Sequence, residues 1–178
     1  MAAKSKIKGS GFEREVCKIL SDEYGSNFAR VPNSGAFVGG KNSTRKSTLT
    51  ENQIKASKGD IIPPDHWDYF NCECKFYKDF PFHHLLQDKS IPLLEQWLDQ
   101  TMDAHDANDI DILFMKFDRK GIYLAFPQAL KKHFHLKKHI NYISPNYGTW
   151  TLTFWSDFQA ETGNTQALEL LAVNGTHK

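Results

Sequence analysis

The sequence lacks the features of membrane and secreted proteins. It has no run of about 18 consecutive apolar residues, the length that a membrane-spanning helix needs, and its N-terminal residues include no apolar core of a signal peptide. Only three cysteines occur in 178 residues, an odd number that argues against a framework of disulfides. We therefore expect a globular cytoplasmic protein with reduced cysteines and no membrane span.

The sequence also lacks a strong net charge. The 22 basic and 21 acidic residues give a net charge of +1, so the total charge does not indicate a nucleic-acid-binding protein. The basic residues are unevenly placed, however, because residues 1–8 contain three lysines and no acid, and residues 38–58 contain five basic residues and one acid. Since residues 37–58 also have hardly any apolar side chains, we predict that they form a mobile basic loop.

Hydrophobic periodicity predicts an α/β protein. A helix is expected from the Ser10–Glu13 capping box to Tyr24, and a second helix from Pro92 to about residue 107. The predicted strands cover residues 27–31, 60–62, 69–77, 110–117, 122–126 and 149–155, and a short basic helix is expected near Leu130. These elements predict a mixed central sheet of about five strands, flanked by helices and followed by extra C-terminal strands.

The length favours one domain that comprises residues 1–178. Within it we expect a core of residues 8–126, which includes the basic loop, and a C-terminal extension of residues 127–178. The segment after residue 162 is weakly patterned, so no element is predicted there.

Two acidic residues are predicted to meet across a pair of strands. If residues 60–62 and 69–77 form an antiparallel hairpin that turns near His66, then Asp60 lies opposite Glu73. Like charges in this arrangement are destabilising unless a cation lies between them. Lys75 shares a face with Glu73, because side chains two residues apart on a strand point the same way. Two carboxylates and a lysine suit a Mg²⁺ or Mn²⁺ ion that activates water for phosphodiester hydrolysis.

Four segments, taken in order and spacing, resemble the motifs of a known enzyme family. They are Lys8–Glu15, Arg30–Gly35, Asp60–Ile62 and Glu73–Lys75. The chain resembles the archaeal-type Holliday junction resolvases, which belong to the PD-(D/E)xK nuclease superfamily. The resemblance implies a restriction-endonuclease-like fold and a metal-dependent DNA endonuclease that resolves four-way junctions by paired nicks. It also implies Mg²⁺ as the cofactor, with Mn²⁺ as a substitute, and branched DNA as the substrate.

The resemblance assigns roles to residues of this sequence. It implies that the metal is bound by Glu13, Asp60 and Glu73. Lys75 would be the catalytic lysine, and Ser34 would lie close to the scissile phosphate. Basic side chains from the same motifs and from the basic loop are expected to contact DNA, and these are Lys8, Arg14, Arg30, Lys41, Arg45, Lys46 and Lys58.

The sequence departs from the family pattern in two places. Gly59 stands where the family has a proline before the aspartate, and residues 37–58 form a long segment that can change the substrate preference. Two alternatives to junction resolution therefore stay open. One is a restriction-type or repair and replication endonuclease of the same fold that acts on forked or duplex DNA. The other is a non-catalytic DNA-binding module.

Structural roles also account for some of these residues one at a time. Glu13 can complete the capping box with Ser10, and Glu73 with Lys75 can form a surface ion pair. A structural zinc site is less favoured, because Cys-x-Cys on a strand points both thiols into one apolar face. Its candidate ligands would be Cys72, Cys74, His83 and His84.

A homodimer is expected on grounds of symmetry. A four-way junction has twofold symmetry, and its resolution needs two matched cuts. Part of the dimer interface is expected to come from aromatic residues near the C-terminus, namely Trp150, Phe154, Trp155 and Phe158.

Overall fold

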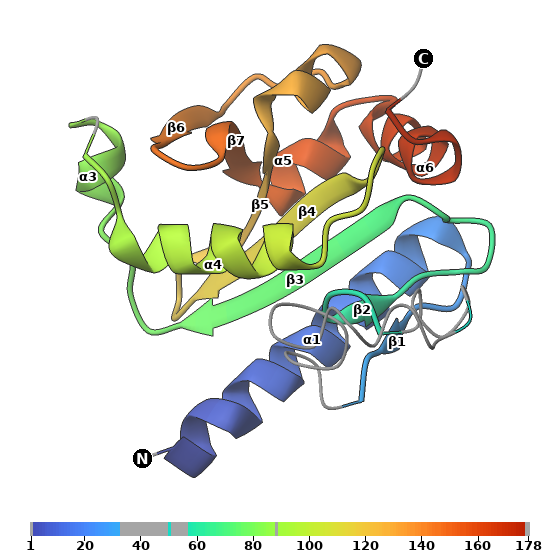
Figure 1. Ribbon diagram of the computed structural model, residues 1–178, viewed down its shortest axis with the longest axis horizontal. Helices are drawn as coiled ribbons and strands as arrows, with labels where there is room; N and C mark the ends of the chain where they lie inside the picture. The colour runs from blue at the N-terminus through green and yellow to red at the C-terminus, as the bar shows by residue number, and fades with distance from the viewer. Residues whose placement is uncertain (1, 33–49, 51–56, 88, 177–178) are drawn as a thin grey trace.

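The computed structural model describes residues 2–32, 50, 57–87 and 89–176 (Figure 1). The helices are α1 (Ala2–Tyr24), α3 (Phe82–Leu85), α4 (Pro92–Asp103), the 3₁₀ helix η2 (Gln128–His133), α5 (Trp155–Ala160) and α6 (Asn164–Asn174). The strands are β1 (Ala29–Arg30), β2 (Ile61–Ile62), β3 (Phe70–Tyr77), β4 (Ile110–Phe117), β5 (Gly121–Pro127), β6 (Ile140–Ser144) and β7 (Gly148–Phe154). None of the described helices combines the length and apolar character that a membrane span requires.

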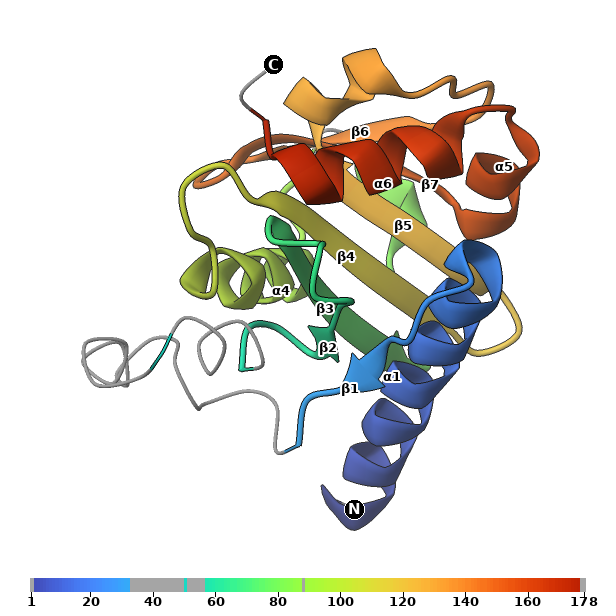
Figure 2. The same ribbon diagram turned by 90° about the vertical axis from the view of Figure 1, so that its right-hand side faces the viewer.

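A five-stranded mixed sheet forms the centre of the molecule. Its strand order is β3-β4-β5-β7-β6, with β3 and β4 parallel and every other neighbouring pair antiparallel. Strands β1 and β2 form a separate antiparallel pair beside β3 (Figure 2). The fold class predicted from the sequence, α/β with a mixed central sheet flanked by helices, is confirmed.

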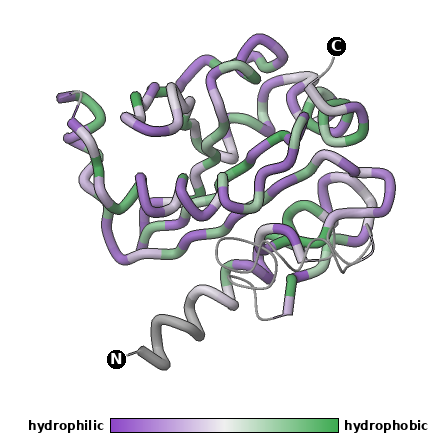
Figure 3. Tube along the Cα trace, viewed as in Figure 1, coloured by the Kyte–Doolittle hydropathy of each residue, from purple (hydrophilic) through white to green (hydrophobic). Residues whose placement is uncertain are grey.

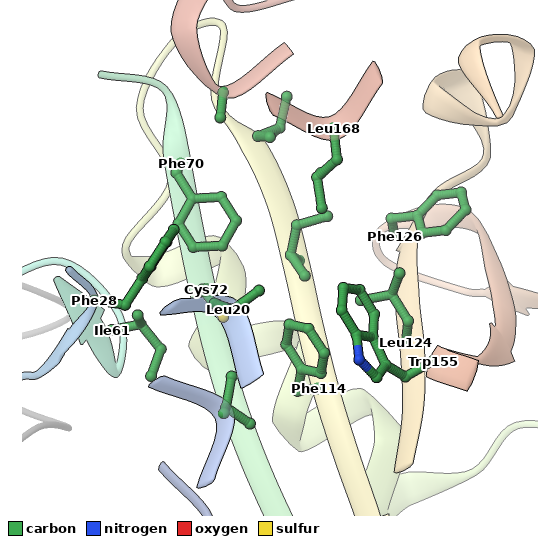
Figure 4. Close-up of a cluster of buried hydrophobic side chains, with 14 of the residues drawn as sticks. Leu20, Phe28, Ile61, Phe70, Cys72, Phe114, Leu124, Phe126, Trp155 and Leu168 are labelled. Carbon is green, nitrogen blue, oxygen red and sulfur yellow. The ribbon is translucent and has the colours of Figure 1, made fainter. Parts of the chain in front are cut away.

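Helices cover both faces of the sheet. Helices α1 and α6 lie on one face, and α4 lies on the other (Figure 2). On the first face, alternate strand residues such as Cys72, Phe114 and Leu124 pack with Leu20 of α1 and Leu168 of α6 in one buried cluster (Figure 4). This arrangement follows from the strand period of two, which sends successive side chains to opposite faces.

The opposite face is covered by α4. Leu94 and Trp97 of this helix are buried against Leu113 and Met115 of β4 in a second cluster. Pro92 begins the helix, where its missing N–H costs no hydrogen bond. Hydrophobic residues therefore gather along the central strands, and hydrophilic residues predominate in the connecting segments (Figure 3).

Two local predictions are wrong, one for the start of α1 and one for the pairing of residues 60–62. Helix α1 begins at Ala2 and not at Ser10, so Ser10 lies inside the helix and cannot cap it. The residues predicted to form a hairpin with β3 pair instead with β1, in the register Ala29 to Ile62 and Arg30 to Ile61. Strand β2 is only two residues long, too short to form a ladder with both neighbours.

The C-terminal residues continue the same sheet and core. Strand β7 bonds to β5, β6 forms the sheet edge, and α6 packs its Leu168 and Leu171 into the core. Strand β6 and helix α6 were not predicted.

The expectation that the C-terminal aromatic residues form a dimer interface is wrong for three of the four. Trp150, Trp155 and Phe158 have at most 4% exposure, and only Phe154, at 39%, is exposed.

Candidate metal centre

Asp60 is held in place by backbone hydrogen bonds to strand β3 and to Val31, the residue that follows β1. Its N–H donates to the Cys72 carbonyl oxygen at 2.8 Å, and its own carbonyl oxygen accepts from the Val31 N–H at 3.0 Å. Its side chain is fixed as well, because Oδ2 accepts from the Cys74 N–H at 2.9 Å. The residue is buried, with 4% exposure. Asp60 therefore lies beside Glu73, as the sequence predicted, although the predicted hairpin does not form.

Glu73 and Lys75 lie on one face of β3 and form an ion pair. This is the α4 face, because Asn71 on the same face donates to the Thr101 carbonyl oxygen of α4 at 2.9 Å. The Glu73 residue is only 7% exposed. A surface ion pair, the structural explanation for these two residues, is therefore excluded.

The electrostatics of this group favour a bound cation. Burial and the nearby Asp60 carboxylate raise the pKa of Glu73 to about 8, since both disfavour its charged form. Burial alone would lower the pKa of Lys75, but the carboxylates of Glu73 and Asp60 outweigh it and raise this pKa. Lys75 thus stays protonated, and a further positive charge beside Glu73 would favour the ionised form of its carboxyl group.

The backbone conformation of Gly59 explains the missing proline of the family motif. Gly59 has a φ of +59°, which lies in the left-handed region. Proline cannot adopt this conformation, because its ring fixes φ at about −65°. A Cβ atom at this position would also lie well inside van der Waals contact with the Cys72 carbonyl oxygen. The close approach brings the next residue, Asp60, against β3.

In the part of the chain that the structure describes, Glu13 forms no ion pair or hydrogen bond with Asp60 or Glu73. It lies on α1 with 8% exposure and forms an ion pair with Arg30 of β1. The backbone next to Arg30 does contact the acidic group, because the N–H of Val31, the residue after β1, donates a hydrogen bond to the Asp60 carbonyl oxygen. The structure thus brings Asp60, Glu73 and Lys75 together, whereas Glu13 pairs with Arg30.

The remaining predicted site residues fall into three groups. Arg14 is exposed on α1. Lys58 is not at the surface, having 8% exposure. Its ammonium group pairs with Asp109 and, at 3.3 Å, with Asp106, an arrangement that opposes its expected contact with DNA. The positions that lie outside the described part of the chain are Ser34, Lys41, Arg45, Lys46, nearly all of the loop 37–58, and the side chain of Lys8.

A second cluster of metal-ligating side chains was missed by sequence analysis. Donor atoms of His105, Asp109 and Asp111 lie within 4.8 Å of one another at the start of β4. The protein already supplies partners for the two acids, because Lys58 pairs with Asp109 and His105 Nδ1 lies 2.8 Å from Asp111 Oδ2. The only signal in the sequence was the density of acids between residues 99 and 111, which does not reveal these contacts.

The residues at Asp60 and Glu73 fit a hard divalent cation. Both contribute carboxylate oxygens, the donors that Mg²⁺ and Mn²⁺ prefer, and both are buried side by side. The cysteines do not compete for such an ion. Cys72 and Cys74 are free thiols in the apolar core, and burial raises the pKa of both. A cation would relieve the repulsion between the two acids, which fits the divalent metals that PD-(D/E)xK nucleases generally use.

Comparison with known proteins agrees with this geometry. The family described as "Phage putative PDDEXK endonuclease" matches residues 4–166. The chain is also similar to Protein D14 of Escherichia phage T5, with 32% identity over 133 residues that cover 72% of this chain and 74% of that protein. No solved structure matches it significantly. The chain belongs to this phage family of the PD-(D/E)xK nuclease superfamily.

Proposed function

We propose that this protein is a Mg²⁺-dependent endodeoxyribonuclease that cuts branched DNA. The observation that carries the proposal is the buried grouping of Asp60, Glu73 and Lys75 on and beside β3. An isolated pair of buried acids would be a liability to the fold, whereas the same pair around a cation is a catalytic site. A non-catalytic DNA-binding module has no need of this grouping.

Each residue of the group has a proposed role. Asp60 and Glu73 hold the metal, and Glu13 supplies a third carboxylate from α1. When bound, the metal polarises the scissile phosphate and lowers the pKa of a bound water. Lys75, kept protonated by its acidic neighbours, orients the attacking water and donates hydrogen bonds to the phosphate oxygens as negative charge develops on them.

Basic side chains near the site would hold the DNA backbone. Arg14 is exposed on the helix that carries Glu13, and Arg30 is half-buried beside it. Lys8, Lys41, Arg45 and Lys46 stay in the proposal as phosphate contacts, and Ser34 as a residue near the scissile phosphate. Lys58 is left out of this group because its charge is already paired.

The preferred substrate is proposed to be the four-way junction, cut by paired nicks in a homodimer. The test is incubation of the purified protein with synthetic junctions, forks and linear duplex under Mg²⁺, with the cuts mapped on each strand. Symmetric paired nicks in the junction alone would support the proposal. Preferential cutting of forks or duplex would assign the same catalytic centre to a restriction-type or repair endonuclease.

Lys75→Met provides the control for the chemistry. Since Lys75 acts on water and phosphate, this variant should lose cleavage while keeping junction affinity close to that of the wild type. Affinity that falls in step with cleavage would contradict the proposed role. Activity that persists in EDTA would contradict the proposed metal dependence.

A further inference from the structure

Lys58 is anchored away from the surface by two acids of the segment before β4. Its side chain is 9% exposed, and its ammonium group pairs with Asp109, whose side chain is 2% exposed. A second carboxylate, that of Asp106, lies 3.3 Å from the same nitrogen. The acids are themselves ordered, because Asp109 Oδ2 accepts from the Asp106 N–H at 2.5 Å and the Asp109 N–H donates to the Asp106 carbonyl oxygen at 3.1 Å.

Lys58 is only two residues from Asp60, and Gly59 between them is held close to β3. The contacts of Gly59 with Cys72 leave no room for a side chain. A Cβ atom here would also lie 3.1 Å from Asn71 Oδ1. The 58–60 segment therefore has one end fixed by charge at Asp109 and the other fixed by hydrogen bonds at β3.

Asn71 links the two ends through the sheet. It is fully buried, and its Nδ2 donates to Asp111 Oδ1 at 2.7 Å and to the Thr101 carbonyl oxygen. Strands β3 and β4 pair in parallel with Asn71 opposite Asp111, so the segment that holds Lys58 is itself fixed to the strand that carries Glu73. Both ends of the 58–60 segment are thus attached to the β3–β4 strand pair, which fixes the position of Asp60.

We propose that Lys58 is a positioning residue whose ion pair with Asp109 holds the Asp60 carboxylate beside Glu73. The inference rests on the proposed metal-dependent nuclease function. It replaces the expected contact of Lys58 with DNA, because an ammonium group engaged by two carboxylates is not free to neutralise phosphate. A buried pair of this kind is costly to break, since removing one partner leaves the other charge buried and unpaired.

The test compares Lys58→Met and Asp109→Asn with the control Lys137→Met. The control removes the same type of side chain from a different ion pair, in which Lys137 Nζ lies 2.9 Å from Glu161 Oε1. Amide hydrogen exchange is measured at Val31, Asp60 and Cys74, whose N–H groups report the bonds that hold Asp60. The amide of Leu124, in the middle of the sheet, serves as the reference for global opening.

Both variants of the pair should exchange about tenfold or more faster at the three reporter amides, with Leu124 unchanged. Mn²⁺ binding without DNA, followed by calorimetry, should weaken by a similar factor. Lys58→Arg should restore both properties, and the double variant should add little to either single one. Lys137→Met should match the wild type.

Three outcomes would overturn the inference. Unchanged exchange at the reporter amides would show that Asp60 is held without Lys58. Faster exchange at all amides, Leu124 included, would show a role in global stability alone. Unchanged exchange with a lower DNA affinity would return Lys58 to the DNA contacts. If the wild type binds no metal and cuts no DNA, the proposed function fails, but the exchange data still decide the positioning role.

Discussion

The Glu73 carboxyl couples folding to pH and, under the proposed function, to metal. Burial and Asp60 raise its pKa from 4.5 to about 8 in the folded protein, so folded Glu73 keeps its proton where the unfolded chain has lost it. The protonated Glu73 therefore stabilises the folded protein fully below pH 4.5, and this stabilisation is lost as the pH rises toward 8. A bound cation has the opposite preference, because it binds the ionised carboxylate.

The first prediction concerns Glu73→Gln without metal. The variant should lose the part of the pH dependence that Glu73 causes, which amounts to roughly a few kcal/mol. Between pH 4.5 and about 8 in EDTA, the free energy of unfolding should therefore fall less for the variant than for the wild type. Urea denaturation at several pH values measures this difference. Identical pH profiles for the two proteins would contradict the shift.

The second prediction separates two aspartates. The literal Pro-Asp of the superfamily name occurs at Pro64–Asp65, but Asp65 is exposed in a turn in which the Trp67 N–H donates to the Pro64 carbonyl oxygen at 3.0 Å. Asp60→Asn should abolish Mg²⁺-dependent cleavage and weaken metal binding. Asp65→Asn should keep most of the activity and cost at most about 1 kcal/mol of stability. The reverse result would move the metal site to the turn.

At the scale of single elements, the sequence predicted strand β3 better than its neighbours. The alternation along β3 placed Glu73 and Lys75 on one face, and that placement is observed because a strand has a fixed period. The hairpin of residues 60–62 with β3 was predicted because Pro63 and Pro64 are typical of a turn, and it does not form. The proximity of Asp60 to Glu73 survives since a single turn at Gly59 brings Asp60 to β3 without a ladder.

Other elements could not be predicted because their signals come from distant contacts. Helix α6 lacks a clean division into polar and apolar faces. Its exposed side carries Leu170 beside Gln166, and its buried side begins with the polar residues Asn164 and Thr165. Its first residue, Asn164, is fully buried. The Asn164 side chain accepts from the His135 N–H and donates to the His135 and Phe158 carbonyl oxygens, at 2.8, 2.8 and 3.1 Å. No sequence pattern reveals a pairing that spans 29 residues.

The third prediction is that Asn164→Ala destabilises the protein by about 2–4 kcal/mol, because the three backbone groups it serves would lose their partners in the interior. Asn174→Ala is the matched control in the same helix, since its bond to the Leu170 carbonyl oxygen is exposed, and it should cost under about 0.5 kcal/mol. Thermal or urea denaturation gives both values. Equal losses would show that Asn164 does not hold α6 to the region of His135.

At the scale of the whole molecule, the proposed function depends on two copies of the site. Three of the four C-terminal aromatics that were expected at the interface, Trp150, Trp155 and Phe158, are core residues, because β7 and α5 complete the sheet and its cover. The buried aromatics therefore do not support the proposed homodimer. Because each chain carries one grouping of Asp60, Glu73 and Lys75, the pattern of DNA cuts can test whether two chains act together.

The last prediction uses Lys75→Met as a silent subunit. In a dimer, an equimolar mixture with wild-type protein contains roughly half mixed dimers, each with a single working centre. Such dimers should nick one strand of a plasmid-borne cruciform and leave an open circle, whereas two working centres give linear plasmid. The ratio of linear to nicked product should therefore fall as Lys75→Met is added at constant wild-type concentration. A ratio that stays constant would show that each cut is made by an independent monomer.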